Sequence, residues 1–386
     1  MRRSLVALSF GTLLLGIAEF VMMGILPYVA SELKVTIAQA GHLISAYAIG
    51  VSVGAPALIL ARKFPLKRIL LALVCMIMIG NTLASVSPNY WMMMAARFIS
   101  GLPHGAYFGV ASIAAAKLAA RGKSAEAVSI MISGMTVANL FGVPLGTALS
   151  ESISWRIPFM LVGAGSLIVL FYIWRWVPDV EGVKDTGLRG QFKFLKKPAP
   201  WLLLSAIVLG NGGIFCWYSY INPLLVHVSG FSESTVTFLM VLAGFGMVIG
   251  NLTGGVLSDK FSPAKVAAFT QLFAAAVLFA IFFWAHISWM AVLLMTLCAG
   301  SLFAISAPQQ LLIIRFSKGG EMLGAAGAQV SFNLGNALGA FLGGLPIAAG
   351  LGYHYSALVG APFALMGFAM LFIFHKKFEI PYEAEH

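Results

Sequence analysis

The dominant feature of the chain is a series of long apolar runs separated by short polar connections. Each run approaches or exceeds the roughly 20 residues that a helix needs to cross the hydrocarbon core of a bilayer. Strict alternation of apolar and polar residues, which a membrane β-barrel requires, is missing from these runs. The pattern therefore predicts twelve transmembrane helices, at residues 5–28, 38–61, 69–86, 90–117, 125–149, 155–176, 201–222, 234–257, 265–285, 288–314, 321–347 and 354–375.

The predicted spans fall into two groups of six, because one long hydrophilic and basic stretch interrupts the series after the sixth run. We predict an N-terminal six-helix bundle at residues 1–177, a cytoplasmic central loop at 178–200 and a C-terminal six-helix bundle at 201–386. The predicted fold class is an all-α membrane protein with two six-helix bundles around a central cavity.

An internal repeat relates the two groups. Sliding the second half over the first aligns Pro27 with Pro223 and Gly50 with Gly246, and it also matches the Lys-Phe pairs at 63–64 and 260–261. Duplicated halves of this kind place a substrate site between them near the bilayer midplane. Chance alignment of glycines is the alternative, and the matching loop dipeptide argues against it.

Composition and charge narrow the class of protein. Apolar residues make up 60% of the chain and charged residues only 10%, whereas soluble domains carry about 25% charged residues. The net charge of +11 would suggest a nucleic-acid partner in a soluble protein, but here the 24 Lys and Arg lie mostly on one side of the predicted spans. Lys34 and Arg156 fall on the other side and Arg97 within a span. The positive-inside rule then predicts that both termini are cytoplasmic, in a bacterial-type inner membrane.

Away from their ends, the predicted spans contain one acidic and one basic residue, Glu19 and Arg97. A charged side chain at mid-bilayer costs about 3 kcal/mol or more, so each needs a partner or a watery cavity. Burial favours the neutral acid and a nearby guanidinium favours the carboxylate, so a cavity that opens to either side in turn could switch the balance. We interpret Glu19 as a proton carrier that meets Arg97. A permanent ion pair that fixes helix packing, and direct substrate binding alone, are the alternatives.

His104 lies two turns after Arg97 on the same face of the predicted fourth helix. Because imidazole titrates near neutrality, His104 is a candidate for a proton relay or a substrate hydrogen bond. A histidine satisfied by a neighbouring carbonyl explains the pattern equally well.

The second half has no acid or base at the equivalent positions, and Phe215 stands where the repeat would place Glu19. We therefore expect this half to supply a mostly apolar substrate wall with amide and hydroxyl anchors. Aromatic residues in membrane helices are more often packing than ligand wall. The candidates are Asn211, Phe215, Tyr218 and Asn222 on the seventh helix, Phe303 and Gln309 on the tenth, and Gln329 and Asn333 on the eleventh.

Several segments resemble a known family. The layout of six plus six helices and the segment GVLSDKFSPAK at 255–265 resemble the major facilitator superfamily and its loop signature. The segments EFVMMGILP at 19–27, RFISGLPHGA at 97–106 and NLFGVPLGT at 139–147 resemble its twelve-span drug:proton antiporter branch, above all the arabinose-efflux-permease-like, sugar-efflux members. The resemblance implies that helices 1, 4, 7 and 10 line the cavity and that helices 2, 5, 8 and 11 form the contact between the halves.

The resemblance also implies a conformational switch. Asp259 and Lys260 match the latch of the loop signature, and Gly142, Pro144 and Gly146 match the antiporter motif of helix 5. In the first copy of the loop signature Arg62 replaces the Asp, so a latch would work through the second half only. Val143 separates Gly142 from Pro144, which departs from the motif.

Glycines at four-residue spacing recur on helices 2, 5, 8 and 11. Such spacing lets backbones approach closely. Because the resemblance places these helices between the halves, we expect a smooth glycine seam there on which the halves rock. Static packing is the alternative.

Together the sequence predicts a proton-coupled secondary transporter that exports a small organic solute, sugar-like or drug-like, by alternating access. The alternatives are a proton symporter that imports such a solute and a transport-inactive membrane sensor. Motifs for a nucleophile, a metal or a phosphate-binding loop are missing from the sequence, so we expect no enzyme, no cofactor and no metal. The expected partners are a small-molecule substrate, protons and membrane lipid, without nucleic acid, and the expected state is a monomer.

Overall fold

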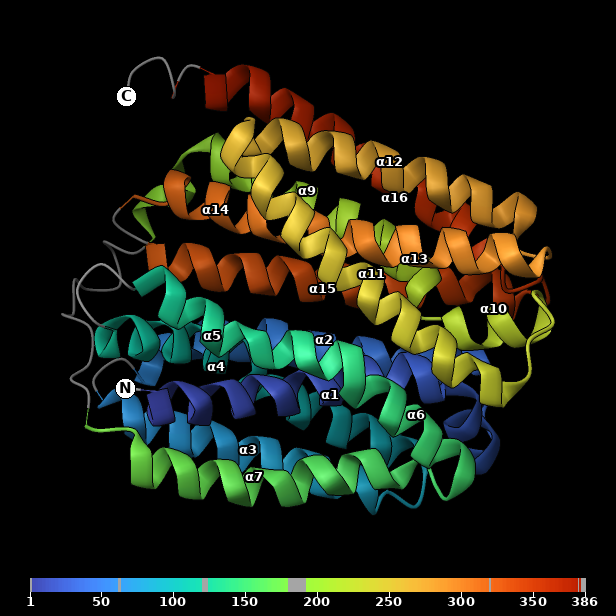
Figure 1. Ribbon diagram of the computed structural model, residues 1–386, viewed down its shortest axis with the longest axis horizontal. Coiled ribbons are helices and arrows are strands. Elements are labelled where there is room, and N and C mark those ends of the chain that lie inside the picture. Colours follow the sequence, from blue (N-terminus) through green and yellow to red (C-terminus); the bar gives the residue numbers. More distant parts are fainter. Residues whose placement is uncertain are drawn as a thin grey trace.

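The chain is built from long helices that run side by side along the molecule (Figure 1). The computed structural model describes residues 2–61, 64–119, 124–179, 192–318, 321–380 and 382. A few side chains on helices within these ranges are not described. In the first half the elements are α1 (Arg2–Leu33), α2 (Ile37–Ala61), α3 (Leu66–Ser85), α4 (Tyr90–Leu118), α5 (Ser124–Val137), the π-helical turn η1 (Ala138–Gly142), α6 (Val143–Ser152) and α7 (Arg156–Trp176).

The second half follows a short 3₁₀ turn, η2 (Lys193–Lys196). Most of the predicted central loop lies outside the described residues. The elements of this half are α9 (Pro198–Tyr218), α10 (Ile221–His227), α11 (Glu233–Lys260), α12 (Pro263–Trp284), α13 (Ser288–Ala304), α14 (Ser306–Phe316), α15 (Glu321–Ala348), α16 (Tyr355–Phe374) and the π-helical turn η3 (His375–Glu379).

The predicted fold class is confirmed. The described residues form twelve helical rods, some of them broken, and ten spans in this part of the chain are long and apolar enough to cross a membrane. Figure 1 shows the helices of the first half together in its lower part and those of the second half above them.

Three rods are interrupted where the sequence analysis expected single helices. The fifth rod contains the π-helical turn η1 directly before Pro144. Proline lacks the N–H that would bond four residues back, and its ring crowds the carbonyl there, so a wider turn accommodates it. The seventh rod breaks between Tyr218 and Ile221, and the tenth breaks at Ile305.

The four-residue glycine series pack within each half and do not form the expected seam between the halves. A Cβ added to Gly54 of α2 would lie 1.8 Å from the carbonyl oxygen of Leu102 on α4, and one added to Gly250 of α11 would lie 2.0 Å from that of Gly300 on α13. The glycines of the fifth rod face α1, and those of α15 face α9. Close packing inside each half, repeated in both halves, is therefore what these glycines provide.

The two halves meet mainly through α2 and α15. The Ser45 hydroxyl donates to the carbonyl of Ala337 at 2.8 Å, and the Ser52 hydroxyl donates to the carbonyl of Val330 at 3.4 Å. A third bond joins α10 to α1, where the side-chain amide of Asn222 donates to the carbonyl of Gly24. These bonds end on backbone carbonyls, so they join the halves without any ionisable group.

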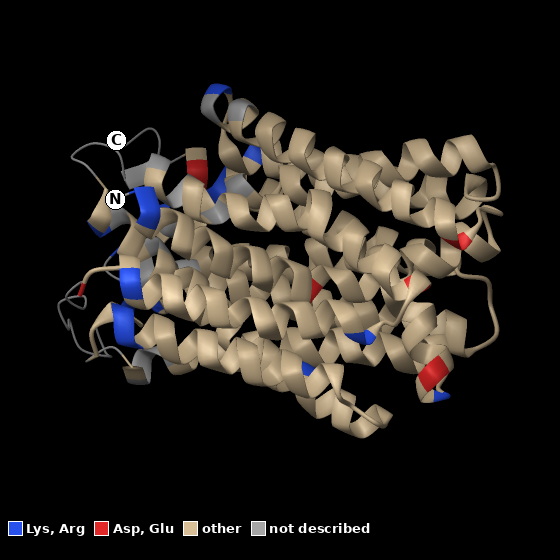
Figure 2. Cartoon of the chain, turned by 60° about the horizontal axis from the view of Figure 1, so that its bottom comes forward, with Lys and Arg blue, Asp and Glu red and all other residues tan. Residues whose placement is uncertain are grey.

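Charge is distributed unevenly along the molecule. Figure 2 shows Lys and Arg gathered at the end that carries both termini, which we call the basic end. The opposite end carries few of them, including Arg156, which lies 3.0 Å from Glu32. The long middle of the molecule is almost free of charge, as a membrane-spanning region requires.

Candidate functional site between the halves

Glu19 lies in the middle of α1, is 1% exposed and faces the boundary between the two halves. Its Oε2 lies 3.7 Å from Nε2 of His104 on α4. Its Oε1 accepts a hydrogen bond of 3.4 Å from Nδ2 of Asn336 on α15. The carboxyl group is therefore held by one side chain from its own half and one from the other, and it does not point at lipid.

Arg97 does not form the direct pair with Glu19 that the sequence analysis expected. Its Nη1 donates to the carbonyl of Ala18 at 2.6 Å, and its Nε donates to the carbonyl of Leu43 at 3.4 Å. The guanidinium lies 4.4 Å from the ring centroid of Tyr47, a cation–π arrangement. Backbone carbonyls and an aromatic face therefore take the place that the carboxylate was expected to occupy beside the guanidinium.

His104 is placed between two polar groups. Its Nδ1 lies 2.8 Å from the hydroxyl of Tyr47, while its Nε2 faces Glu19. The imidazole stacks on Phe108 with ring centroids 5.2 Å apart. Tyr47, His104 and Glu19 thus form a continuous polar chain in the first half. The sequence analysis missed Tyr47, because a tyrosine in an apolar span carries no signal of its own.

Aromatic rings from both halves pack beside Glu19. Phe20, the next residue on α1, meets Tyr218 at 6.3 Å and Phe303 at 6.2 Å between ring centroids. Phe215 meets Tyr218 edge-on and Phe332 at 5.2 Å. The structure therefore brings together the three aromatic candidates of the second half. Phe20 and Phe332 were not among the sequence candidates.

Two of the amide candidates lie inside the second half. Asn211 of α9 donates to Oε1 of Gln309 on α14 at 3.2 Å and accepts from Nε2 of Gln271 on α12 at 3.0 Å. All three side chains are buried. The side chains of this amide cluster, Asn211, Gln271 and Gln309, bond to one another within one bundle, which favours a packing role over the predicted substrate contact.

The other amide candidates are bonded locally or to backbone. Asn333 donates to the carbonyl of Gln329, one turn earlier on α15, at 3.0 Å. Asn222 is bonded to Gly24 across the halves. The amide that reaches Glu19 is that of Asn336, one turn further along α15 than Asn333, and the sequence analysis did not single it out.

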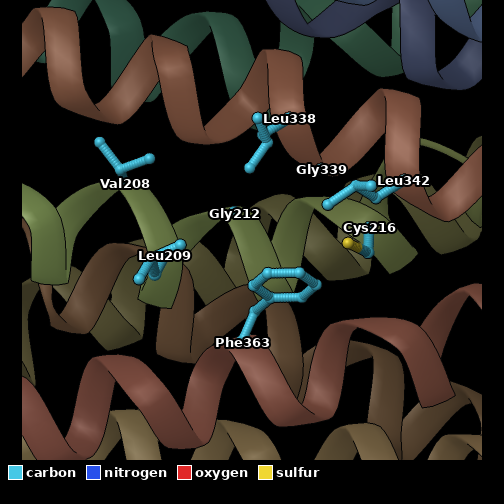
Figure 3. Close-up of a pocket in the computed structure, with 8 residues that line it drawn as sticks. All are labelled: Val208, Leu209, Gly212, Cys216, Leu338, Gly339, Leu342 and Phe363. Atoms are coloured by element: carbon cyan, nitrogen blue, oxygen red, sulfur yellow. The ribbon is translucent and has the colours of Figure 1, made fainter.

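A small apolar depression lies elsewhere in the second half, between α9, α15 and α16 (Figure 3). Gly212 and Gly339 form part of its lining, where α9 and α15 approach each other closely. Its lining carries no charged or amide side chain, so we assign no substrate contact to it. The lining consists of Val208, Leu209, Gly212, Cys216, Leu338, Gly339, Leu342 and Phe363.

Comparison with known proteins identifies the family. A family model described as the Major Facilitator Superfamily matches residues 8–329, with a second match at 230–385. The chain belongs to the major facilitator superfamily. Its members are transporters.

Relatives and a solved structure agree with this assignment. This superfamily member is 45% identical to the AraJ protein of Escherichia coli (strain K12) over 372 residues, which is 96% of the chain and 94% of that protein. It is 24% identical to a protein of Helicobacter pylori named "Probable sugar efflux transporter", over 96% of the chain and 95% of the other protein. A bacterial homologue of the human lysosomal transporter Spinster, crystallised inward-facing and unoccupied, has a TM-score of 0.75 at 18% identity and shares the fold over 98% and 97% of the two chains.

The predicted switch residues of this superfamily member are only partly described. Lys260 is exposed at the end of α11, whereas the side chain of Asp259 lies outside the described part of the structure. Gly142 and Gly146 press on α1, where an added Cβ would lie 2.5 Å from Ile17 and 2.6 Å from Val21. The motif around Pro144 therefore shapes the contact between the fifth rod and α1.

Proposed function

We propose that this superfamily member is a proton-coupled secondary transporter that exports a small organic solute, sugar-like or drug-like, by alternating access. One observation carries the proposal: the Glu19 carboxyl is buried at the boundary between the halves and held from both sides. In such a place the charge of the group depends on which half surrounds it, so proton binding and the arrangement of the halves affect each other.

The proposed proton binding at Glu19 requires only side chains of the protein itself. An ionised Glu19 accepts from Asn336 and lies beside His104, and these two side chains offset part of the cost of burying its charge. Protonation removes the charge and weakens both contacts. In the arrangement seen here the ring of Phe20, the residue that follows Glu19, packs against the rings of Tyr218 and Phe303. A solute entering between them would displace these rings and expose Glu19 to the water that accompanies it.

Export, membrane and orientation are part of the proposal. The clustering of Lys and Arg at the end with both termini supports a cytoplasmic location of that end in a bacterial inner membrane. Efflux is supported by the antiporter-like segments and by the printed name of the Helicobacter pylori relative. We expect the protein to act as a monomer with membrane lipid, a small-molecule substrate and protons as its partners, and without a cofactor.

Transport by purified protein in liposomes tests the proposal. A thermal-shift screen across sugars, nucleosides and common antibiotics first selects a solute, and its uptake is then measured with the vesicle interior more acidic or more alkaline than the outside. An antiporter accumulates the solute when protons leave the vesicle, and a symporter does so when protons enter.

Glu19→Gln is expected to abolish uptake driven by a pH gradient while solute exchange continues. Glu151→Gln is the matched control, because Glu151 is exposed at the end of α6. Driven transport by Glu19→Gln at the rate of the parent protein would show that Glu19 is not the proton carrier.

A further inference from the structure

The contact between Glu19 and Asn336 differs from the other hydrogen bonds between the halves. Among the described residues three such bonds, donated by Ser45, Ser52 and Asn222, end on backbone carbonyls. The bond from Asn336 ends on a carboxyl group, whose capacity to accept changes when it binds a proton. This contact therefore links the strength of attachment between α1 and α15 to the protonation of one side chain.

We propose that Asn336 is a positioning residue through which the second half responds to the protonation of Glu19. The inference rests on the proposed function, because it assigns to the second half a role in the same proton coupling. The amide is completely buried, and its Nδ2 reaches Glu19 from the opposite half. Asn336 therefore cannot exchange this hydrogen bond for one to water when the carboxyl of Glu19 gains or loses a proton.

The unused oxygen of Asn336 supports this role. Its Oδ1 is buried and has no hydrogen-bond partner in the described part of the structure. An ionised Glu19 can only accept, and it is served by the NH₂ group of Asn336. A protonated Glu19 carries a donor, which the Oδ1 of a rotated amide can accept. A carboxamide can bond either form, but only the ionised form gives the stronger, charge-assisted contact.

The neighbourhood of Glu19 contains other titratable groups. These are His104 and Arg97 on α4, Tyr47 on α2 and Tyr218 on α9. His104, Arg97 and Tyr47 belong to the same half as Glu19, so their contacts with it do not join the halves. Tyr218 approaches from the second half, where it packs edge-on against Phe20. Of these groups and Asn336, it is the amide that hydrogen-bonds the carboxyl across the boundary.

The sign of the effect follows from this geometry. At high pH the ionised Glu19 holds Asn336, which favours the arrangement of α1 and α15 seen here. As the pH falls and Glu19 binds a proton, its hydrogen bond with Asn336 weakens. The two halves then separate more readily at one end of the molecule. Removing the amide should therefore lower the population of this arrangement at high pH by roughly tenfold, the effect of one hydrogen bond to a charged group, and flatten its dependence on pH.

Distances between spin labels on the two halves test this without any solute. The protein is reconstituted in lipid nanodiscs, and pulsed electron resonance measures one label pair at each end of the molecule between pH 5 and pH 9. Cys75 is replaced by Ala, whereas Cys216 and Cys298 are buried and can remain. The labelled positions are all more than half exposed: Phe64 with Phe261 at the basic end, and Ile153 with Trp289 at the opposite end.

The parent is expected to exchange between two distance populations with pH, and Glu19→Gln to lose this response. Asn336→Ala should lose most of it, while Asn336→Gln, which keeps a carboxamide, should recover part. Asn81→Ala is the matched control, because Asn81 is a buried asparagine that bonds to the carbonyl of Ile77 on its own helix. It should respond to pH as the parent does.

The outcomes separate the two proposals. If the parent shows no response to pH, or Glu19→Gln responds as the parent does, proton coupling through Glu19 is wrong and this inference falls with it. If Glu19→Gln is unresponsive while Asn336→Ala follows the parent, the inference alone is overturned. An equal loss in Asn81→Ala would also overturn it, since any buried asparagine would then suffice.

Discussion

Two adjacent glycines on α11 predict opposite effects of the same substitution. A Cβ added to Gly254 would lie 2.1 Å from the carbonyl oxygen of Ala304 on α13, whereas one added to Gly255 meets nothing within 4 Å. Carbon and oxygen atoms in close contact ordinarily stay about 3.3 Å apart or more. Gly254→Ala would therefore require α11 and α13 to separate by roughly 1 Å, a displacement that the tightly packed contact resists.

The magnitudes follow from packing and helix propensity. Overpacking of a close contact costs about 1–3 kcal/mol, so Gly254→Ala should destabilise the protein by this amount. Gly255→Ala fills open space in a helix and should stabilise it by up to about 1 kcal/mol, the propensity difference between Gly and Ala. The two variants should thus differ by roughly 2–4 kcal/mol.

Equilibrium unfolding of both variants in mixed micelles, at increasing mole fractions of a denaturing detergent, measures this difference. The two variants carry the same Gly→Ala substitution at neighbouring positions of one helix, so Gly255→Ala serves as the control for Gly254→Ala. Equal stability of the two variants, or a more stable Gly254→Ala, would refute the argument that the glycines set the distance between α11 and α13.

Two further predictions concern buried charged side chains. Arg97→Lys should lower stability by about 1.5–3 kcal/mol, because an ammonium cannot bond the Ala18 carbonyl and cover the Tyr47 ring as the planar guanidinium does; thermal unfolding that matches the parent would contradict this. Glu379→Gln should cost about 1 kcal/mol and speed hydrogen exchange in the first turn of α12, because the Glu379 carboxylate accepts from the N–H of Ala264 there; unchanged exchange would show that this cap is unimportant.

The sequence was sufficient to predict the fold class and the position of the key acid. The apolar runs have the length of membrane spans, and the predicted boundaries lie within a few residues of most observed helices. The high cost of a charge in hydrocarbon indicated that Glu19 would face other protein groups, and the structure places it between the halves. These inferences depend on length and charge, which are visible along the chain.

The partners of the charged residues were not predictable in the same way. Arg97 is bonded to backbone carbonyls, and every residue offers one, so no pattern distinguishes those of Ala18 and Leu43. On α15 the candidate amides were Gln329 and Asn333, but Asn336 reaches Glu19. Asn333 and Asn336 lie about one turn apart, and which of them faces Glu19 depends on how far α15 is rotated against α2, which only tertiary packing fixes.

The prediction of a glycine seam between the two halves was wrong for a related reason. Four-residue spacing shows that another backbone comes close, but not which helix supplies it. In both halves the glycines bring together helices of one bundle, as Gly54 does with α4 and Gly250 with α13. These four-residue series therefore report on the construction of each half and not on the surface between the halves, where Gly244 of α11 packs against the backbone of Asn139.

The resulting division of contacts suits a protein whose halves move as bodies. Within each half, glycines let backbones touch at distances that leave no room for a methyl group, so sliding of one helix past another is strongly opposed. Between the halves, the hydroxyls of Ser45 and Ser52 bond to carbonyls and aromatic rings meet edge-on, and such contacts can be exchanged for others at modest cost. Glu19 is the one buried carboxylate that joins the halves by a hydrogen bond in the described structure, and it lies among these exchangeable contacts. In the proposed mechanism, a proton on Glu19 therefore acts where a small change in free energy would shift the arrangement of the whole molecule.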